Sequence, residues 1–325
     1  QVYVTDNVEG IVPEFLTMLR GVIDSPDIPL NVSRSYLQAD GAVKKISSYI
    51  TRKVADKLKS LFNEDRKGFE EKWNDIKIVI EYGMLSEDKF FEKADKFALY
   101  PTVDGSYFLW EELIEKIKPA QTDKDGKTVV LYTSNKETQH SYIAAAKSKG
   151  YDVLLLDSPI ISHLMQKLES SKEKVSFVRV DADHADNLVN KEEEQISKLS
   201  DEEKETLQKA ITETIADSGY TVQVEAMSSD AAPFMITQPE FMRRMKEMQA
   251  SGGGGGMMGF GNMPDMYNLV VNGNHDLVQS IFTEKDETKK AGLIQQGVDL
   301  AKLSQGLLKG EKLTDFVNRS YGLIK

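Results

Sequence analysis

The sequence predicts a multidomain protein that combines α/β and α+β architecture. Its 325 residues are more than one ordinary domain holds. Between residues 128 and 180, apolar runs alternate with amphipathic stretches in the order strand, helix, strand, helix, strand. This order is typical of parallel strands joined by right-handed crossovers. From residue 275 onward the pattern is helical only.

The first elements form a helical region after a stiff loop. Two prolines in the segment 24–30 exclude helix there. Apolar residues then recur at spacings of three and four, which predicts one long helix. Those residues are Val43, Ile46, Ile50, Val54, Leu58 and Leu61. Phe69, Trp73 and Ile76 continue the pattern in a second helix, which we expect to end near Gly83 in a left-handed turn.

The central α/β unit is predicted from three buried strands. These strands span residues 128–134, 153–157 and 175–180. A helix over 136–149 should end at Gly150, and Ser158-Pro159 offers a cap and a first turn for the next helix.

The last part of the chain mixes strands and helices. From about Asn187 a charge-rich stretch predicts an exposed helix between two domains. Strands are expected at 221–226, 234–237 and 268–272, with a Met-rich helix over 239–249 and a glycine run at 252–256. Terminal helices are expected at 275–283, 287–308 and 313–323.

Composition restricts the partners. Acidic residues outnumber basic ones by 52 to 41, so the net charge is −11 and the surface repels nucleic acid and anionic membranes. The chain has no cysteine, which excludes disulfides and fits a reducing cytoplasm. No apolar run approaches the ~20 residues of a membrane helix. We expect a cytoplasmic protein with no nucleic-acid or membrane partner.

The sequence contains no pattern for catalysis or metal binding. The first strand of the α/β unit is followed by Asn135-Lys136-Glu137, without the glycine loop that a phosphate needs. Gly126-Lys127-Thr128 precedes a strand and reads as a turn. The four histidines share no metal-ligand spacing. The segment 181–184 (DADH) could form a weak metal cluster, but a solvated loop that leaves a strand is the favoured interpretation. We therefore expect no metal site.

One segment carries a family resemblance. Within residues 15–38, the run RGVIDS followed by DIPLNVSR closely resembles the middle-domain signature of the ninety-kilodalton heat-shock chaperones of the bacterial HtpG type. The resemblance extends more loosely to the chain's end. It implies a large α/β middle part over 1–110, a small three-layer α/β subdomain over 111–187, and an α+β dimerisation domain over 188–325. It also implies that an N-terminal ATP-binding domain is missing.

The resemblance assigns a role to Arg34 and Gln38. In the family, this loop contacts the γ-phosphate of ATP held by the N-terminal domain. A guanidinium can neutralise that phosphate, and Gln38 lies one helical turn further on. Alternatively, Arg34 caps local carbonyls or pairs with Asp24 or Asp27. Ser35 departs from the acidic residue usual at its position. ATP and Mg are expected only for the full-length protein, so this fragment is not expected to be an enzyme.

A Met-rich segment is the candidate client-binding surface. We expect its helix to present one apolar face, with Arg243, Arg244, Lys246 and Glu247 largely on the others. Flexible thioethers suit surfaces that fit many partners. The resemblance implies contact with client proteins, whereas an ordinary core is the alternative. The candidate residues are Phe241, Met242, Met245, Met248, Met257, Met258 and Phe260.

The terminal helices predict a homodimer. Two such helices cannot bury their broad apolar stripes alone, whereas two copies would make a four-helix bundle. The predicted interface comprises Leu293, Ile294, Val298, Leu303, Leu307, Phe316, Val317, Tyr321 and Leu323. The chain ends without an acidic tail peptide, so we do not expect co-chaperones that read such a tail.

These observations predict part of an ATP-dependent, stress-related molecular chaperone that binds non-native polypeptides and dimerises. A protein-binding scaffold without chaperone activity is the main alternative, and an enzyme with a hidden site in the α/β unit is another. The signature within residues 20–38 favours the chaperone.

Overall fold

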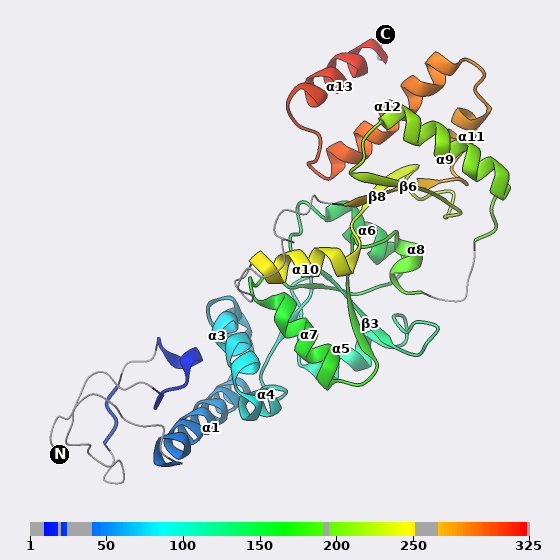
Figure 1. The fold of residues 1–325 in the computed structure, drawn as a ribbon. Helices are drawn as coiled ribbons and strands as arrows, with labels where there is room; N and C mark the ends of the chain where they lie inside the picture. The colour runs from blue at the N-terminus through cyan, green and yellow to red at the C-terminus, as the bar shows by residue number, and fades with distance from the viewer. Residues whose placement is uncertain (1–9, 19–20, 25–40, 191–194, 251–265, 324–325) are drawn as a thin grey trace. The chain divides into compact units, whose positions relative to one another are not determined.

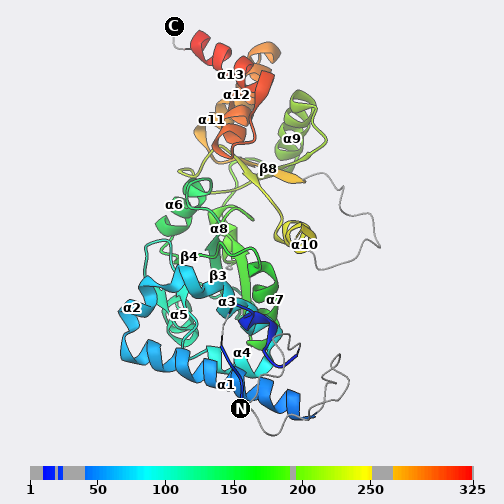
Figure 2. The same cartoon turned by 90° about the vertical axis from the view of Figure 1, so that its left-hand side faces the viewer.

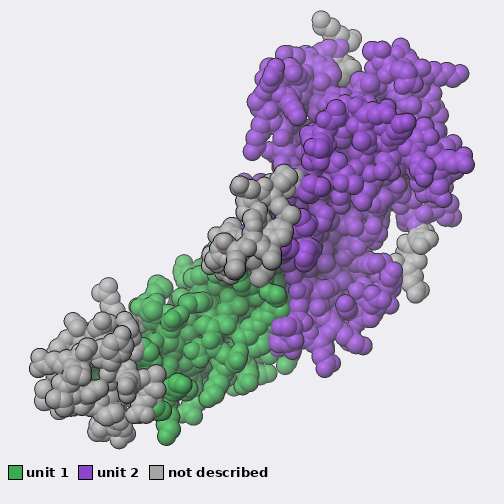
Figure 3. Space-filling view, in the orientation of Figure 1, with its two compact units in different colours: residues 1–101, 105–114, 158–168 green, residues 102–104, 115–157, 169–325 purple. Residues whose placement is uncertain are grey.

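A computed structural model describes residues 10–18, 21–24, 41–190, 195–250 and 266–323. The chain divides into two compact units (Figure 3). The first comprises residues 1–101, 105–114 and 158–168, and the second comprises 102–104, 115–157 and 169–325. None of the helices in the described part of the chain is long and apolar enough to cross a membrane.

The first unit is mainly helical. Its elements are η1 (Glu14–Leu16), α1 (Gly41–Glu64), α2 (Arg66–Glu71), α3 (Trp73–Ser86), α4 (Asp88–Ala94), β1 (Tyr100–Pro101) and β2 (Tyr107–Phe108). Strands β1 and β2 pair antiparallel. Helices α5 (Trp110–Ile117) and α7 (Ile161–Ser171) contribute residues to both units.

Helix α1 confirms the predicted long helix, with its core face slightly rotated. The most buried positions described on it are Val43, Thr51, Ala55 and Phe62, whereas Leu61 is exposed. The core beside it is aromatic. Phe15 and Phe90 lie 4.8 Å apart between ring centroids, and Phe90 and Phe97 lie 5.7 Å apart.

Gly83 is not a helix terminator, so that prediction was wrong. It lies inside α3, which continues to Ser86. A Cβ atom at this position would approach Phe15 Cδ2 to 2.7 Å and Phe90 Cε1 to 2.9 Å. The glycine is there because two aromatic rings pack directly on the helix backbone.

The predicted α/β unit is confirmed in the second unit. Strands β3 (Thr128–Thr133), β4 (Val153–Leu155) and β5 (Val175–Arg179) form a parallel sheet in the order β4-β3-β5. Helices α6 (His140–Ser148) and α8 (Ala185–Leu188) pack on one face through a core that includes Val129, Leu131 and Val153. Gly150 follows α6 with a φ of 78°, as its predicted role requires.

A second, mixed sheet follows in the same unit. Strand β8 (Tyr267–Asn272) lies between β6 (Tyr220–Glu225), to which it is parallel, and β7 (Phe234–Thr237), to which it is antiparallel. Figures 1 and 2 show the helices of this part on one side of the sheet. They are α9 (Asp201–Ile215), α11 (Asp276–Thr283) and α12 (Glu287–Ser304), and α13 (Gly310–Leu323) follows.

Two boundaries differ from the prediction because local capping decides them. The charged stretch after Asn187 is not one helix: α9 begins only after Ser200, whose side chain accepts from the Glu203 N–H while Glu203 accepts from the Ser200 N–H. The helix expected over 287–308 ends at Ser304, where Gly306 takes a φ of 64°.

Helix α12 contains two glycines in opposite surroundings. A Cβ atom on Gly297 would approach Phe234 Cε2 to 2.4 Å, and Phe234 lies in the core between helix and sheet. A Cβ atom on Gly292 would meet no atom within 4 Å. The first glycine therefore permits close packing, whereas the second only adds backbone entropy to the unfolded chain.

We expect Gly297→Ala and Gly292→Ala to change stability in opposite directions. The first should lower the free energy of unfolding by about 1–3 kcal/mol because it overpacks a core. The second should raise it by about 0.5–1 kcal/mol because alanine favours helix. Denaturant unfolding of both variants checks this pair, and equal effects would contradict the packing argument.

Candidate functional site

The predicted site residues differ in how far the structure describes them. Arg34, Gln38, Met257, Met258 and Phe260 lie outside the described residues. Met248 and Leu323 lie in α10 (Glu240–Ala250) and α13, but their side chains are not described. The described part of the Met-rich segment therefore centres on α10.

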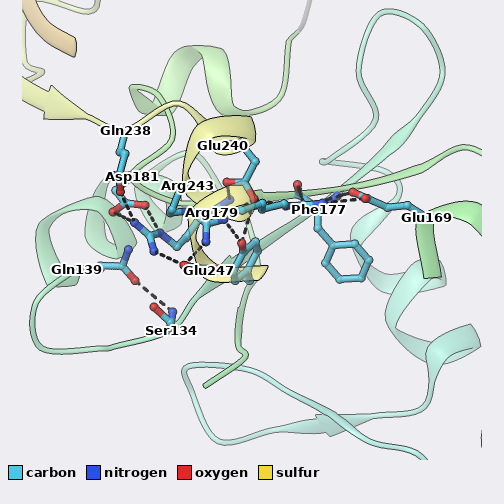
Figure 4. A network of polar contacts seen from close by, with 12 residues as sticks. Ser134, Gln139, Glu169, Phe177, Arg179, Asp181, Gln238, Glu240, Arg243 and Glu247 are labelled. Carbon is cyan, nitrogen blue, oxygen red and sulfur yellow. Dashed lines mark hydrogen bonds and ion pairs between the residues drawn. The ribbon is translucent and has the colours of Figure 1, made fainter. Parts of the chain in front are cut away.

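Helix α10 lies along the free edge of a sheet. Strand β5 is an edge strand because β3 is its neighbour in the order β4-β3-β5. A free edge presents unpaired N–H and C=O groups, which proteins usually cover. Here, charged side chains cover it (Figure 4). Glu169 accepts the Phe177 N–H at 2.7 Å, Glu240 accepts the Arg179 N–H at 3.1 Å, and Arg244 donates to the Phe177 carbonyl at 2.5 Å.

The Glu240 carboxylate is the centre of this contact. Besides the Arg179 N–H, it accepts from the Tyr132 hydroxyl at 2.9 Å and from the Arg244 Nε at 2.6 Å. Arg243 donates to both Glu240 and the Tyr132 hydroxyl. Charge-assisted bonds of this kind are stronger than neutral ones. We call Tyr132, Glu169, Arg179, Glu240, Arg243, Arg244 and Glu247 the α10 network.

Arg179 links the sheet to the remaining members. Its guanidinium donates to both oxygens of Asp181, at 2.5 and 2.8 Å, and to Glu247 at 3.4 Å. It also donates to Gln238 at 3.3 Å, just before α10 begins. Arg243 donates to the same Glu247 at 2.5 Å. The start and the middle of α10 are thereby both tied to β5.

The network shifts the pKa values of its members. Burial opposes ionisation of Glu240, but Arg243 and Arg244 outweigh it and hold the pKa of this carboxyl below its usual range. Burial, together with the Glu240 charge, raises the pKa of the Tyr132 hydroxyl well above its ordinary value. Glu240 is therefore ionised and Tyr132 is a neutral donor at neutral pH.

This geometry corrects the predicted orientation of the Met-rich helix. Arg243 was expected on a solvent face, yet it is only 4% exposed. Met242 and Met245 are half-buried, and Phe241 is 71% exposed. The helix turns charged side chains toward the protein because carboxylate and hydroxyl groups that accept their hydrogen bonds lie there. Of the predicted client-binding residues with described side chains, Phe241 is the one that is freely accessible.

The terminal helices bury part of the predicted dimer interface within one chain. Ile294 and Val298 are 1% and 0% exposed and belong to the core on the β6-β8-β7 sheet. Phe316 is buried, and Leu293 and Leu307 are half-buried. These five were expected at an interface, but their own chain already covers them wholly or partly. Leu303, Val317 and Tyr321 remain exposed, together with Leu300.

A second polar cluster lies just beyond β5. His184 is 2% exposed, and its Nε2 lies 2.8 Å from Glu225 Oε2, at the end of β6. Burial lowers the pKa of His184, but the hydrogen bond to Glu225 and the nearby Asp183 and Asp186 raise it overall. The segment was expected to be a solvated loop, and for His184 that prediction was wrong. Sequence spacing gave no signal, because Glu225 lies 41 residues away.

Comparison with known proteins identifies the family. A family model described as Hsp90 protein matches residues 1–324. The chaperone protein HtpG of Bacteroides thetaiotaomicron is 44% identical over all of this chain and 57% of its own length. HtpG of Porphyromonas gingivalis is 47% identical over 93% of this chain and 44% of its own length. The chain belongs to the Hsp90 family, and it spans about half the length of these relatives.

We expect Glu240→Gln to release α10 from the edge of β5. The amide cannot balance the two arginines, so the free energy of opening α10 should fall by about 2–3 kcal/mol. Hydrogen exchange of the amides in 240–247 measures this change. Glu205→Gln, on the exposed side of α9, is the matched control and should shift opening by less than about 0.5 kcal/mol.

A comparison of the unsubstituted chain with Glu240→Gln also tests the pH dependence of α10. The pKa of Glu240 is lowered in the folded chain, so its stabilising contribution is present above the unfolded pKa and is lost as pH falls. After correction for intrinsic exchange rates, acidification should weaken protection of α10 in the unsubstituted chain. Glu240→Gln should lack this component, and an identical pH response would argue against the role of the carboxylate.

Proposed function

We propose that this chain works as the middle and C-terminal part of an ATP-dependent molecular chaperone. The observation that carries the proposal is the match of the whole chain to proteins named chaperone protein HtpG. The acidic composition, with its net charge of −11, is compatible with a cytoplasmic location. Its binding partners would be non-native polypeptides and a second copy of the chain.

Client binding is assigned to the Met-rich segment, with Phe241 as its accessible apolar side chain. Phe241 is 71% exposed on a helix whose charged side is already engaged by the protein. An accessible aromatic side chain beside flexible thioethers offers adaptable apolar surface to a partner. Met242 and Met245 flank it, and the remaining proposed contacts are Met248, Met257, Met258 and Phe260.

ATP contact is assigned to Arg34 and Gln38. The proposal rests on the signature in residues 20–38 and on the ability of a guanidinium to neutralise a γ-phosphate. ATP and Mg would be bound by another part of the whole protein. Unchanged ATP hydrolysis by an Arg34→Ala variant of that whole protein would remove this role.

We expect Phe241→Ser to weaken the suppression of client aggregation by this chain. Loss of one buried aromatic contact lowers binding by about 1.5 kcal/mol or more, which is roughly tenfold in affinity. Light scattering of a heat-denatured client, titrated with the chain, measures the effect. Ile196→Ser is the control because Ile196 is 90% exposed and lies outside the proposed surface.

Two results separate the candidate functions. If the unsubstituted chain suppresses aggregation and Phe241→Ser alone weakens this, the chaperone proposal and its surface both stand. If the unsubstituted chain has no effect on aggregation at any concentration, a protein-binding scaffold without chaperone activity becomes the better account.

Dimerisation is assigned to the exposed apolar residues of α12 and α13. Leu303, Val317 and Tyr321 are 41%, 38% and 66% exposed, and Leu300 is 51% exposed. The proposed interface therefore consists of the outer side of the two helices rather than their whole apolar surface.

We expect the chain to be a dimer in solution and the double variant Leu303→Glu, Tyr321→Glu to be a monomer. Charges introduced into an apolar interface carry a large desolvation penalty. Light scattering after size exclusion gives both masses, and Ile196→Glu should leave the dimer intact. A monomeric unsubstituted chain at micromolar concentration would overturn the assignment.

A further inference from the structure

The cluster around His184 brings together a strand residue of one sheet and two residues that follow a strand of the other. Asp183 and His184 follow β5, and Glu225 is the last residue of β6. One donor atom from each of the three lies within 4.8 Å of the other two. His184 Nε2 lies 2.8 Å from Glu225 Oε2 and 3.9 Å from Asp183 Oδ1.

The burial of the three residues leaves one side open. His184 has a side chain that is 3% exposed, so its imidazole is fixed by packing. Asp183 and Glu225 have side chains that are 41% and 30% exposed. Two partly exposed carboxylates therefore lie near the same buried imidazole nitrogen. Like charges held this close repel each other, and a cation between them relieves the repulsion.

The other ring nitrogen lies near a carboxylate but makes no hydrogen bond. His184 Nδ1 is buried without a hydrogen-bond partner, and Asp186 Oδ2 lies 4.0 Å from it. Asp186 also pairs with Lys149, which holds its carboxylate in place. Metal-bound histidines commonly direct their second N–H toward a carboxylate. The imidazole thus has carboxylates at both ends, with the potential ligands at Nε2.

We propose that Asp183, His184 and Glu225 form a binding site for a zinc ion. One imidazole and two carboxylates supply the mixed nitrogen and oxygen ligands that Zn²⁺ accepts, with water as a fourth ligand. Mg²⁺ and Ca²⁺ prefer oxygen ligands alone and need more of them. Zinc bonds of about 2.0–2.2 Å in tetrahedral geometry require His184 Nε2 and Glu225 Oε2, now 2.8 Å apart, to separate by about half an ångström.

A zinc ion here would connect the two sheets of the second unit. Glu225 belongs to the β6-β8-β7 sheet, whereas Asp183 and His184 continue from the β4-β3-β5 sheet. Binding would therefore stabilise this unit in proportion to zinc concentration and affinity. This role is independent of client binding and of ATP contact, so the proposed function can fail while the zinc site stands.

Isothermal titration of the metal-stripped, full chain with zinc chloride tests the proposal. We expect saturation at one ion per chain and a weaker response to magnesium chloride. His184→Asn should lower zinc affinity by more than about tenfold, the lower range seen for loss of supporting groups. His140→Asn is the matched control because His140 is exposed and lies outside the cluster, and it should bind zinc normally.

A second variant guards against misfolding of the first. In the unsubstituted chain the backbone N–H of His184 donates to Asp183 Oδ1 at 2.7 Å. Asp183→Asn keeps an oxygen that can accept this bond but removes one charge. Zinc should raise the melting temperature of the unsubstituted chain and His140→Asn more than that of Asp183→Asn. Equal zinc affinity in all variants, or no binding by the unsubstituted chain, would overturn the proposal and leave a histidine–carboxylate ion pair.

Discussion

The second unit depends on how the free edge of β5 is covered. A strand edge without a neighbour leaves backbone groups unpaired. Glu169, Glu240 and Arg244 satisfy the N–H groups of Phe177 and Arg179 and the carbonyl of Phe177. Because these side chains are charged, each needs a counter-charge, and the rest of the α10 network supplies them. The position of the Met-rich helix is therefore a consequence of an edge strand and its need for partners.

Much of the fold was predictable because it follows from local patterns. The period of apolar residues in 43–61 and the alternation over 128–180 predicted α1 and the parallel sheet correctly. Capping chemistry then decided where elements begin and end, as at Ser200. Gly83 was misread because a glycine in a helical pattern has two physical meanings. It can end a helix, or it can admit a ring against the backbone, and the positions of Phe15 and Phe90 decide between them.

The site was less predictable because its contacts are long-range. Tyr132 and Glu240 are 108 residues apart, and His184 and Glu225 are 41 apart. The spacing of charged residues did contain one usable signal. Glu240, Arg243, Arg244 and Glu247 occur at helical spacings of three and four, so their charges complement one another on one face. A face with balanced charges can be buried, whereas the amphipathic interpretation assumed that charge always faces solvent.

A polar contact also has consequences for how α10 can leave β5. Removing a helix that is held by apolar packing exposes hydrocarbon to water at about 25 cal/mol per Å². Removing a helix that is held by ion pairs returns guanidinium and carboxylate groups to water, which solvates them well, so much of the lost interaction is recovered. Phe241, already 71% exposed, makes little contact that would be lost. The α10 network therefore fixes the helix in a defined place while keeping the free energy of release moderate, a combination that suits a segment proposed to meet many polypeptides.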